Sequence, residues 1–235
     1  MSSSIHAPTA IPAAFPVEVT TSPMACWSAP DTDLGRQLAE AEAEAFPEAP
    51  QLFAGDASSI LMGMAFGGLV RHLMRLSVPA IAPGVAMPLI LDDLARSGQG
   101  LTHQQLLDHY GARGIALDRV VSVETNVRVG EREADIPSAD MSYLSVFDLM
   151  RRIGSGAVFA HLNDAARSSF ARVGLQDEPI AGVEGLRTPG VHPGEFDDHY
   201  TPVCLPVTEG NVAVIEALSP AMAASRWSPE PPPWW

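Results

Sequence analysis

The sequence predicts an α+β fold in which a central N-terminal helix packs on an antiparallel β-sheet. Three observations favour this class. A long apolar segment at 57–76 covers most of a helical circumference, strand-like patterns occur at 119–129 and 157–163, and a strand–turn–strand pattern follows at 203–218. A helix that is apolar on most sides belongs in the middle of a domain.

The first half of the chain is predicted to be mostly helical. Asp31–Ala45 has an apolar stripe and begins with Asp31 or Thr32 as its cap. Ala57–Leu76 is the main helix, and its glycines allow neighbouring elements to approach closely. Two shorter helices are expected at Leu89–Arg96 and at His103–Ala112, the second capped by Thr102.

The second half is predicted to hold the sheet. Alternation predicts a strand at Arg119–Val129, and an apolar run predicts a buried strand at Ala157–Asn163. Gly210 and Asn211 suit the tight turn of a hairpin. The remaining expected elements are a helix at Ser142–Ile153, loops over 164–198, and hairpin strands at Val203–Val207 and Val212–Leu218.

Length and composition are compatible with one sizeable domain that has an extension at each end. The chain has 235 residues, of which 46% are hydrophobic and 18% are charged, and this is enough to build a single core. Proline spacing predicts a Pro-rich N-terminal arm with an acidic helix at 1–50, a main domain at 51–222, and a Pro- and Trp-rich tail at 223–235.

Net charge restricts the possible partners. The 28 acidic and 14 basic residues give a formal net charge of −14, which repels nucleic acid and anionic membranes and favours a basic peptide or a cationic small molecule. The N-terminus lacks a basic residue and a long apolar run, so no secretory signal is expected. No apolar run approaches the roughly 20 residues of a membrane span, and we therefore expect a cytoplasmic protein.

The start of the long predicted helix has the layout of a cysteine-nucleophile segment. Gln51 precedes Ala57, which opens the helix, by six positions. A cysteine in the first turn of a helix is favoured as the thiolate, a His on a facing strand can take its proton, and an acid can orient that His. A preceding Gln can donate to the oxyanion. The candidates are Gln51, Ala57 at the nucleophile position, His199 as the base and Glu216 as the acid.

The segment 51–62 resembles the nucleophile motif of the bacteriocin-processing, double-glycine peptidases. In that motif a Gln is followed, after four residues, by Asp-Cys-Gly and an apolar helix. The matching positions here are Gln51, Asp56, Ala57 in place of Cys, Ser58 in place of Gly, and then Ser59, Leu61 and Met62. Downstream, His199 and the predicted hairpin are similar to the strand pair that carries the family's His and acid, with Glu216 nearest to the acid position.

This resemblance implies a papain-like fold and a thiol-dependent hydrolase. The expected activity is that of a cysteine peptidase, amidase or acyltransferase acting on a peptide or amide without a cofactor. Hydrolysis and acyl transfer are both compatible with this chemistry. Because Ala57 lacks a nucleophile, the chain as given is expected to be inactive, either through a deliberate Cys replacement or as a natural pseudopeptidase that binds peptides.

Other residues offer alternative sites. Cys26 lies in a Cys-Trp pair but has no upstream Gln, so a structural role is favoured, and Ser58 or Ser59 could replace the missing nucleophile. Cys204 is expected to be a packing residue. A metal-dependent protein is a further alternative, with His161, His192, Asp198 and His199 as the possible ligands.

Overall fold

The chain folds into two units, each with its own part of β-sheet structure. The computed structural model describes residues 13–14, 16, 24–28, 32–46, 59–81, 84–131, 138–152, 154–189, 199–223 and 228–229. Unit 1 comprises 1–7, 77–124 and 150–214, and unit 2 comprises 8–76, 125–149 and 215–235. The strand β4 (Val121–Arg128) therefore contributes its first four residues to unit 1 and its last four to unit 2.

Unit 1 contains strands in the order β6-β8-β5-β4, with β7 also pairing with β8. β4 and β5 are parallel, whereas β8 runs antiparallel to its neighbours. The expected strands at 119–129, 157–163 and 203–207 are confirmed. The bounds are Ala157–Asn163 for β5, Glu178–Pro179 for β6, Thr188–Pro189 for β7 and His199–Pro206 for β8.

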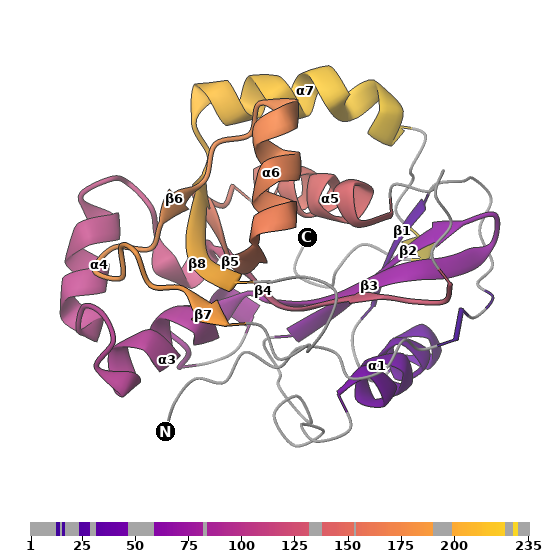
Figure 1. Cartoon of the computed structure of the whole chain (residues 1–235), viewed down its shortest axis with the longest axis horizontal. Coiled ribbons are helices and arrows are strands. Elements are labelled where there is room, and N and C mark those ends of the chain that lie inside the picture. The colour runs from indigo at the N-terminus through magenta and orange to yellow at the C-terminus, as the bar shows by residue number, and fades with distance from the viewer. Residues whose placement is uncertain are drawn as a thin grey trace. The chain divides into compact units, whose positions relative to one another are not determined.

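The helices of unit 1 pack around this sheet, as Figure 1 shows. The neighbouring helices α3 (Leu89–Ser97) and α4 (His103–Gly111) confirm the two short predicted helices, and Thr102 caps α4 through a complete capping box. α6 (Asp164–Val173) contacts β5 and β8. Short 3-10 turns lie at Pro79–Ile81 and Leu117–Arg119. The shared core includes Leu91, Leu94, Leu106, Tyr110, Phe159 and Cys204.

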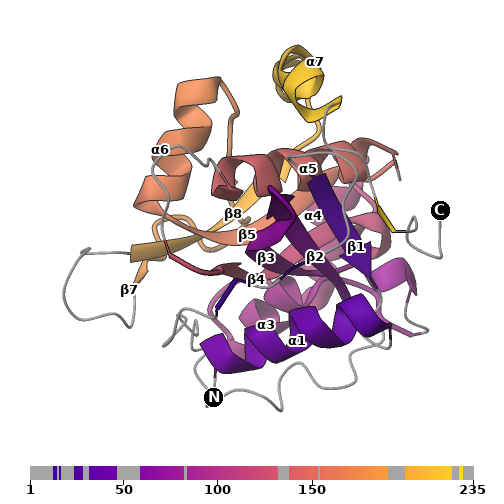
Figure 2. The same cartoon turned by 90° about the vertical axis from the view of Figure 1, so that its right-hand side faces the viewer.

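Unit 2 places α1 against β1 and β2, as Figure 2 shows. Its strand order continues from β4 through β3, β2 and β1 to β9. α1 confirms the predicted acidic helix, with Thr32 as its cap. The bounds are Met24–Ser28 for β1, Asp33–Ala45 for α1, Ser59–Phe66 for β2, Leu69–Ser77 for β3 and Ser228–Pro229 for β9. Most of α5 (Ser138–Arg152) also belongs to this unit.

The predicted central helix at 57–76 is wrong, because its described part forms the hairpin of β2 and β3. Gly67 and Gly68 both have positive φ, at 59° and 78°, which is the requirement of a tight two-residue hairpin turn. Both strands are almost entirely buried, so they lack the alternation that identifies a strand with one face in water. A continuous apolar run does not distinguish a buried strand from a buried helix.

Two further predictions near the C-terminus are corrected. The expected strand at 212–218 belongs to the helix α7 (Glu209–Ala223). The hydroxyl of Thr208 accepts the Asn211 N–H at 3.2 Å, in the manner of a helix cap. The region predicted as loops at 164–198 contains α6, whose N-cap is Asn163. No helix in the described ranges has both the length and the apolar character needed to cross a bilayer.

β8 accommodates its prolines because their carbonyls face away from β5. The Pro202 carbonyl accepts the Ile180 N–H at 3.2 Å, and the Pro206 carbonyl accepts the Asn211 side-chain amide at 2.8 Å. In an antiparallel strand the N–H and C=O of one residue point to the same side. The missing N–H groups therefore lie on the side away from the β5 ladder, in line with the rule for proline in strands.

Candidate active site

Only two of the four residues predicted for a thiol site, His199 and Glu216, lie in the described structure. Gln51 and Ala57 lie outside the described residues, so their predicted roles remain untested. His199 is the first residue of β8 and is partly exposed, whereas Glu216 is exposed on the helix α7. The predicted arrangement needed His and acid on two paired strands, and Glu216 is not on a strand.

The alternative nucleophiles and the metal site also find no support. Cys26 lies in β1 opposite Gly63, away from any helix start, and Ser59 is buried in β2. Ser58, His192 and Asp198 fall outside the described residues, so their predicted roles remain untested. Across the ranges that are described, no group of three or more His, Cys, Asp or Glu side chains is placed to hold a metal ion.

Cys204 is a core residue, as predicted. It is fully buried in unit 1, and burial raises the pKa of its thiol. In the same core Tyr110 stacks edge-on against Phe159 at 5.1 Å between ring centroids, and its hydroxyl accepts the Ala181 N–H at 3.2 Å. A thiol held in its protonated form in such a core is a poor nucleophile.

The pairing between β4 and β5 ends early, and this is the main irregularity in unit 1. The parallel ladder contains three residue pairs and stops at Val123–Ala160. β5 continues as a strand to Asn163 and, in the described part of the chain, its last three residues pair on one side only, with β8. Because Pro202 faces away from β5, the backbone of Leu162 points to β8, whereas the His161 C=O and the Asn163 N–H point to the other side. In the described structure no strand of the ladder pairs with these two groups, so they can bind an extended ligand.

Two polar side chains stand at the point where the ladder stops. Glu124 and His161 are the residues that directly follow the last pair, so each would come next in the register of β4 and β5. Both side chains are partly exposed. An acid and an imidazole therefore occupy the end of the paired segment, beside the backbone of β5 that lacks a partner strand.

Glu124 is held by a buried serine. The Ser77 hydroxyl donates to Oε1 of Glu124 at 2.5 Å, and Ser77 itself is 1% exposed at the end of β3. The bond fixes one oxygen of a carboxylate that solvent still reaches.

His161 is neutral at physiological pH. Burial lowers the pKa of its imidazole to about 4. A neutral imidazole carries one N–H donor and one acceptor nitrogen. His161 can therefore donate a hydrogen bond to a developing negative charge without itself being charged.

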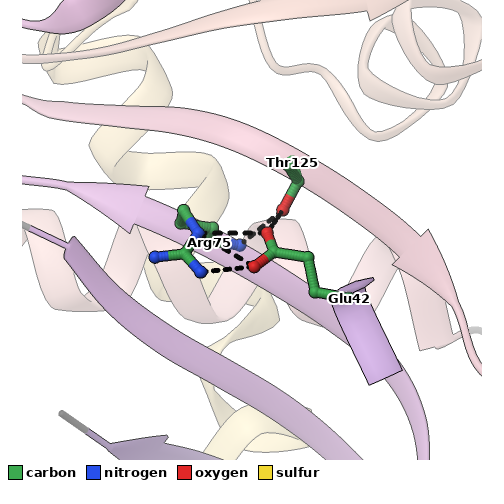
Figure 3. Close-up of polar contacts among 3 residues, drawn as sticks. All are labelled: Glu42, Arg75 and Thr125. Carbon is green, nitrogen blue, oxygen red and sulfur yellow. Dashed lines mark hydrogen bonds and ion pairs between the residues drawn. The ribbon is translucent and has the colours of Figure 1, made fainter. Parts of the chain in front are cut away.

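Unit 2 contains a different carboxylate, which is fully enclosed. Figure 3 shows Glu42 of α1 between Arg75 of β3 and Thr125 of β4. The Arg75 guanidinium binds both oxygens of Glu42 through Nε, at 3.1 and 3.0 Å, and also through Nη2, while Thr125 donates to Oε1 at 2.5 Å. Glu42 and Arg75 are 2% and 3% exposed. The cluster is a closed ion pair and is inaccessible to a substrate.

A second buried polar chain in unit 2 joins β3, β4 and α5. His72 Nε2 contacts the side-chain oxygen of Asn126, whose amide donates to the Tyr143 hydroxyl at 2.5 Å. Burial lowers the pKa of His72 to about 4, so the chain is uncharged at neutral pH.

Comparison with known proteins defines the fold. No protein-family model and no curated protein matches this sequence. The solved structure of BjaI, a CoA-dependent acyl-homoserine lactone synthase with SAM and isopentyl-CoA, has a TM-score of 0.56 and 11% identity, over 91% of this chain and 97% of that chain. The chain is similar in fold to the acyl-homoserine lactone synthases. A second CoA-dependent member, MesI, has a TM-score of 0.50 and 10% identity, over 82% of this chain and 93% of that chain.

This likeness overturns the papain-like, bacteriocin-peptidase interpretation and the thiol-protease and peptide-hydrolase function that it implied. The broader α+β class is confirmed. The likeness in fold to BjaI agrees with the β2–β3 hairpin found where the central helix of the papain-like interpretation was expected. The signal overlooked in the sequence was Glu124, a lone acidic residue inside the strongly strand-like run 119–129.

Proposed function

We propose that this chain is an acyltransferase that moves an acyl group from a CoA thioester to the amino group of an α-amino acid derivative. The observation that carries the proposal is the early end of the β4–β5 ladder with Glu124 as the next residue. The likeness to BjaI, which was solved with SAM and isopentyl-CoA, suggests the two substrate classes.

The open segment of β5 is the proposed binding site for the acyl donor, the CoA thioester. The pantetheine arm of CoA is an extended chain that contains amide groups, and such a chain can hydrogen-bond to the backbone of a strand. Beyond Ala160, the backbone groups of His161 and Asn163 point to the side without a ladder partner in the described structure, whereas those of Leu162 point to β8. A thioester bound there would lie next to the end of the paired segment.

Glu124 is the proposed binding group and base for the acyl acceptor, the amine. The amine nitrogen attacks the thioester carbonyl carbon and forms the new C–N bond, and the positively charged nitrogen then loses a proton. We assign Glu124 to bind the amine and to take that proton, since its side chain is partly exposed and is held in place by the Ser77 hydroxyl. The C–S bond breaks, and CoA leaves as the thiol once the thiolate is protonated.

His161 is proposed to stabilise the negative charge that develops on the thioester carbonyl oxygen. During attack the carbonyl oxygen gains negative charge, and preorganised N–H donors stabilise it. The neutral imidazole of His161 supplies such a donor at the required end of β5. A charged imidazolium is not required for this role, which agrees with the lowered pKa.

The proposal is tested by acyl transfer with the purified full chain. Acyl-CoA thioesters of different chain lengths are incubated with SAM or with free amino acids, while thiol release and amide mass are followed together. We expect thiol release that depends on the acceptor and matches amide formation. Thiol release without an acceptor would indicate a thioesterase instead, and no release with any thioester would overturn the proposal.

A further inference from the structure

We infer that Ser77 is the positioning residue for Glu124 in acyl transfer, and that it acts by fixing the direction of the carboxylate. The inference rests on the proposed function of Glu124. Ser77 ends β3, Glu124 follows the paired part of β4, and both belong to unit 1. Their side chains are joined by a 2.5 Å hydrogen bond although 47 positions separate them in the sequence.

The hydrogen bond limits the freedom of the Glu124 side chain. A Glu side chain at a partly exposed site has several rotamers of similar energy, and the broad torsion at its carboxylate adds further freedom. Donation from Ser77 to Oε1 restricts that rotation and thereby sets the direction of the second oxygen. A base works only when it lies within hydrogen-bond reach of the proton that it takes.

Because Ser77 is buried, its hydrogen bond to Glu124 is not exchanged for one to water. Its side chain is 1% exposed, so water does not replace the carboxylate as the partner of its hydroxyl. The anchor is therefore rigid, whereas the carboxylate that it holds is partly exposed to solvent. A rigid second residue behind a reactive group is the arrangement that keeps an active site preorganised.

Steady-state kinetics with matched variants tests the inference. Ser77→Ala removes the hydroxyl, and the control Ser155→Ala removes an equally buried hydroxyl in unit 1 that donates to the Ala157 carbonyl at 2.9 Å. We expect Ser77→Ala to lower kcat by about tenfold with little change in KM for the acyl-CoA, because one charge-assisted hydrogen bond is lost from the base. Ser155→Ala should retain the wild-type kcat.

A double-mutant cycle separates positioning from a general structural role. In the Glu124→Gln background the Ser77→Ala change should lower kcat no further, since the group that Ser77 positions has already lost its function. Ser77→Thr and Ser77→Val have the same shape and differ in the hydroxyl, so the Thr variant should be the more active of the two. If Ser77→Ala does not fold, the comparison of Ser77→Thr with Ser77→Val provides the test in its place.

The outcomes distinguish this inference from the proposed function. An active wild-type chain with unchanged kcat in Ser77→Ala would overturn the inference and leave the function standing. The same would follow from equal losses in the wild-type and Glu124→Gln backgrounds, or from equal activity of the Thr and Val variants. A wild-type chain that transfers no acyl group would overturn both.

Discussion

Glu124 and Thr125 are neighbours in β4, yet they belong to two very different polar groups. Glu124 is a partly exposed carboxylate held at one oxygen by Ser77 in unit 1. Thr125 helps to enclose the Glu42–Arg75 ion pair of unit 2, which is almost inaccessible to solvent. Solvent exposure therefore separates the candidate catalytic carboxylate of Glu124 from the enclosed, structural carboxylate of Glu42.

The two carboxylates also differ in what surrounds them. Both oxygens of Glu42 are occupied by Arg75, and Thr125 adds a third donor group. Loss of either partner from such a pair leaves a buried charge without its counter-ion, which is strongly destabilising. Glu124 keeps access to solvent and lies at the end of the β4–β5 ladder.

The largest effect is expected from removal of the proposed catalytic base, Glu124. Glu124→Gln keeps the shape of the side chain and can still accept the Ser77 hydrogen bond, but it cannot take a proton. We expect kcat to fall by about 100-fold or more, with a small change in melting temperature. The matched control is Glu178→Gln, a partly exposed acid of unit 1 that pairs with Arg113 at 2.5 Å. Equal activity losses in the two variants would contradict the assignment.

The next largest effect is expected on stability, from disruption of the Glu42–Arg75 ion pair. Glu42→Gln leaves the buried charge of Arg75 without its counter-ion and should lower the free energy of unfolding by about 3–5 kcal/mol. Chemical denaturation of the two proteins measures this difference. Replacement of both partners, as Glu42→Met with Arg75→Met, should restore much of the stability because no unpaired charge remains. A single variant as stable as the wild type would show that the pair is not structural.

A third prediction uses pH to probe the His72 chain of unit 2. Burial holds the pKa of His72 at about 4, below its ordinary value of 6.5. The unfolded chain therefore binds a proton before the folded chain does, and stability is lost as the pH falls from about 6.5 to 4. The loss from this group is roughly 3 kcal/mol. Denaturation curves across this range should show a shallower loss for His72→Gln, and an identical slope in the variant would contradict the assignment.

The smallest predicted effects are losses of stability on removal of one helix cap in each unit. Thr32 caps α1 of unit 2, and Thr102 caps α4 of unit 1. Replacement of either residue by Ala should cost about 1 kcal/mol, as measured by chemical denaturation, without changing KM. A change in KM in either variant would show that the cap also supports substrate binding.

Local signals predicted much of this fold. The helices capped by Thr32 and Thr102 and the strands β4 and β5 follow directly from side-chain chemistry and periodicity. The hairpin at Gly67 and Gly68 was missed because both of its strands are buried, which removes the alternation that marks a strand. The predicted boundaries at 50 and 222 remain predictions.

The candidate site depended on information that sequence patterns do not carry. Glu124 and His161 stand 37 positions apart, and what associates them is the register at which the parallel pairing of β4 and β5 stops. Ser77 contacts Glu124 through a tertiary hydrogen bond that no local pattern signals. The order of a Gln, an apolar segment and a later His fitted a thiol site, but spacing alone does not specify which strands pair.

The most direct test of the account is hydrogen exchange of the chain with and without an unreactive acyl-CoA analogue. Occupation of the free side of β5 should slow exchange of the Asn163 backbone amide most, because its N–H points to that side without a ladder partner in the described structure. The amides of α1 in unit 2 should exchange as they do without ligand. Slowed exchange elsewhere, with the end of β5 unaffected, would contradict the claim that the open end of the β4–β5 pair binds the acyl donor.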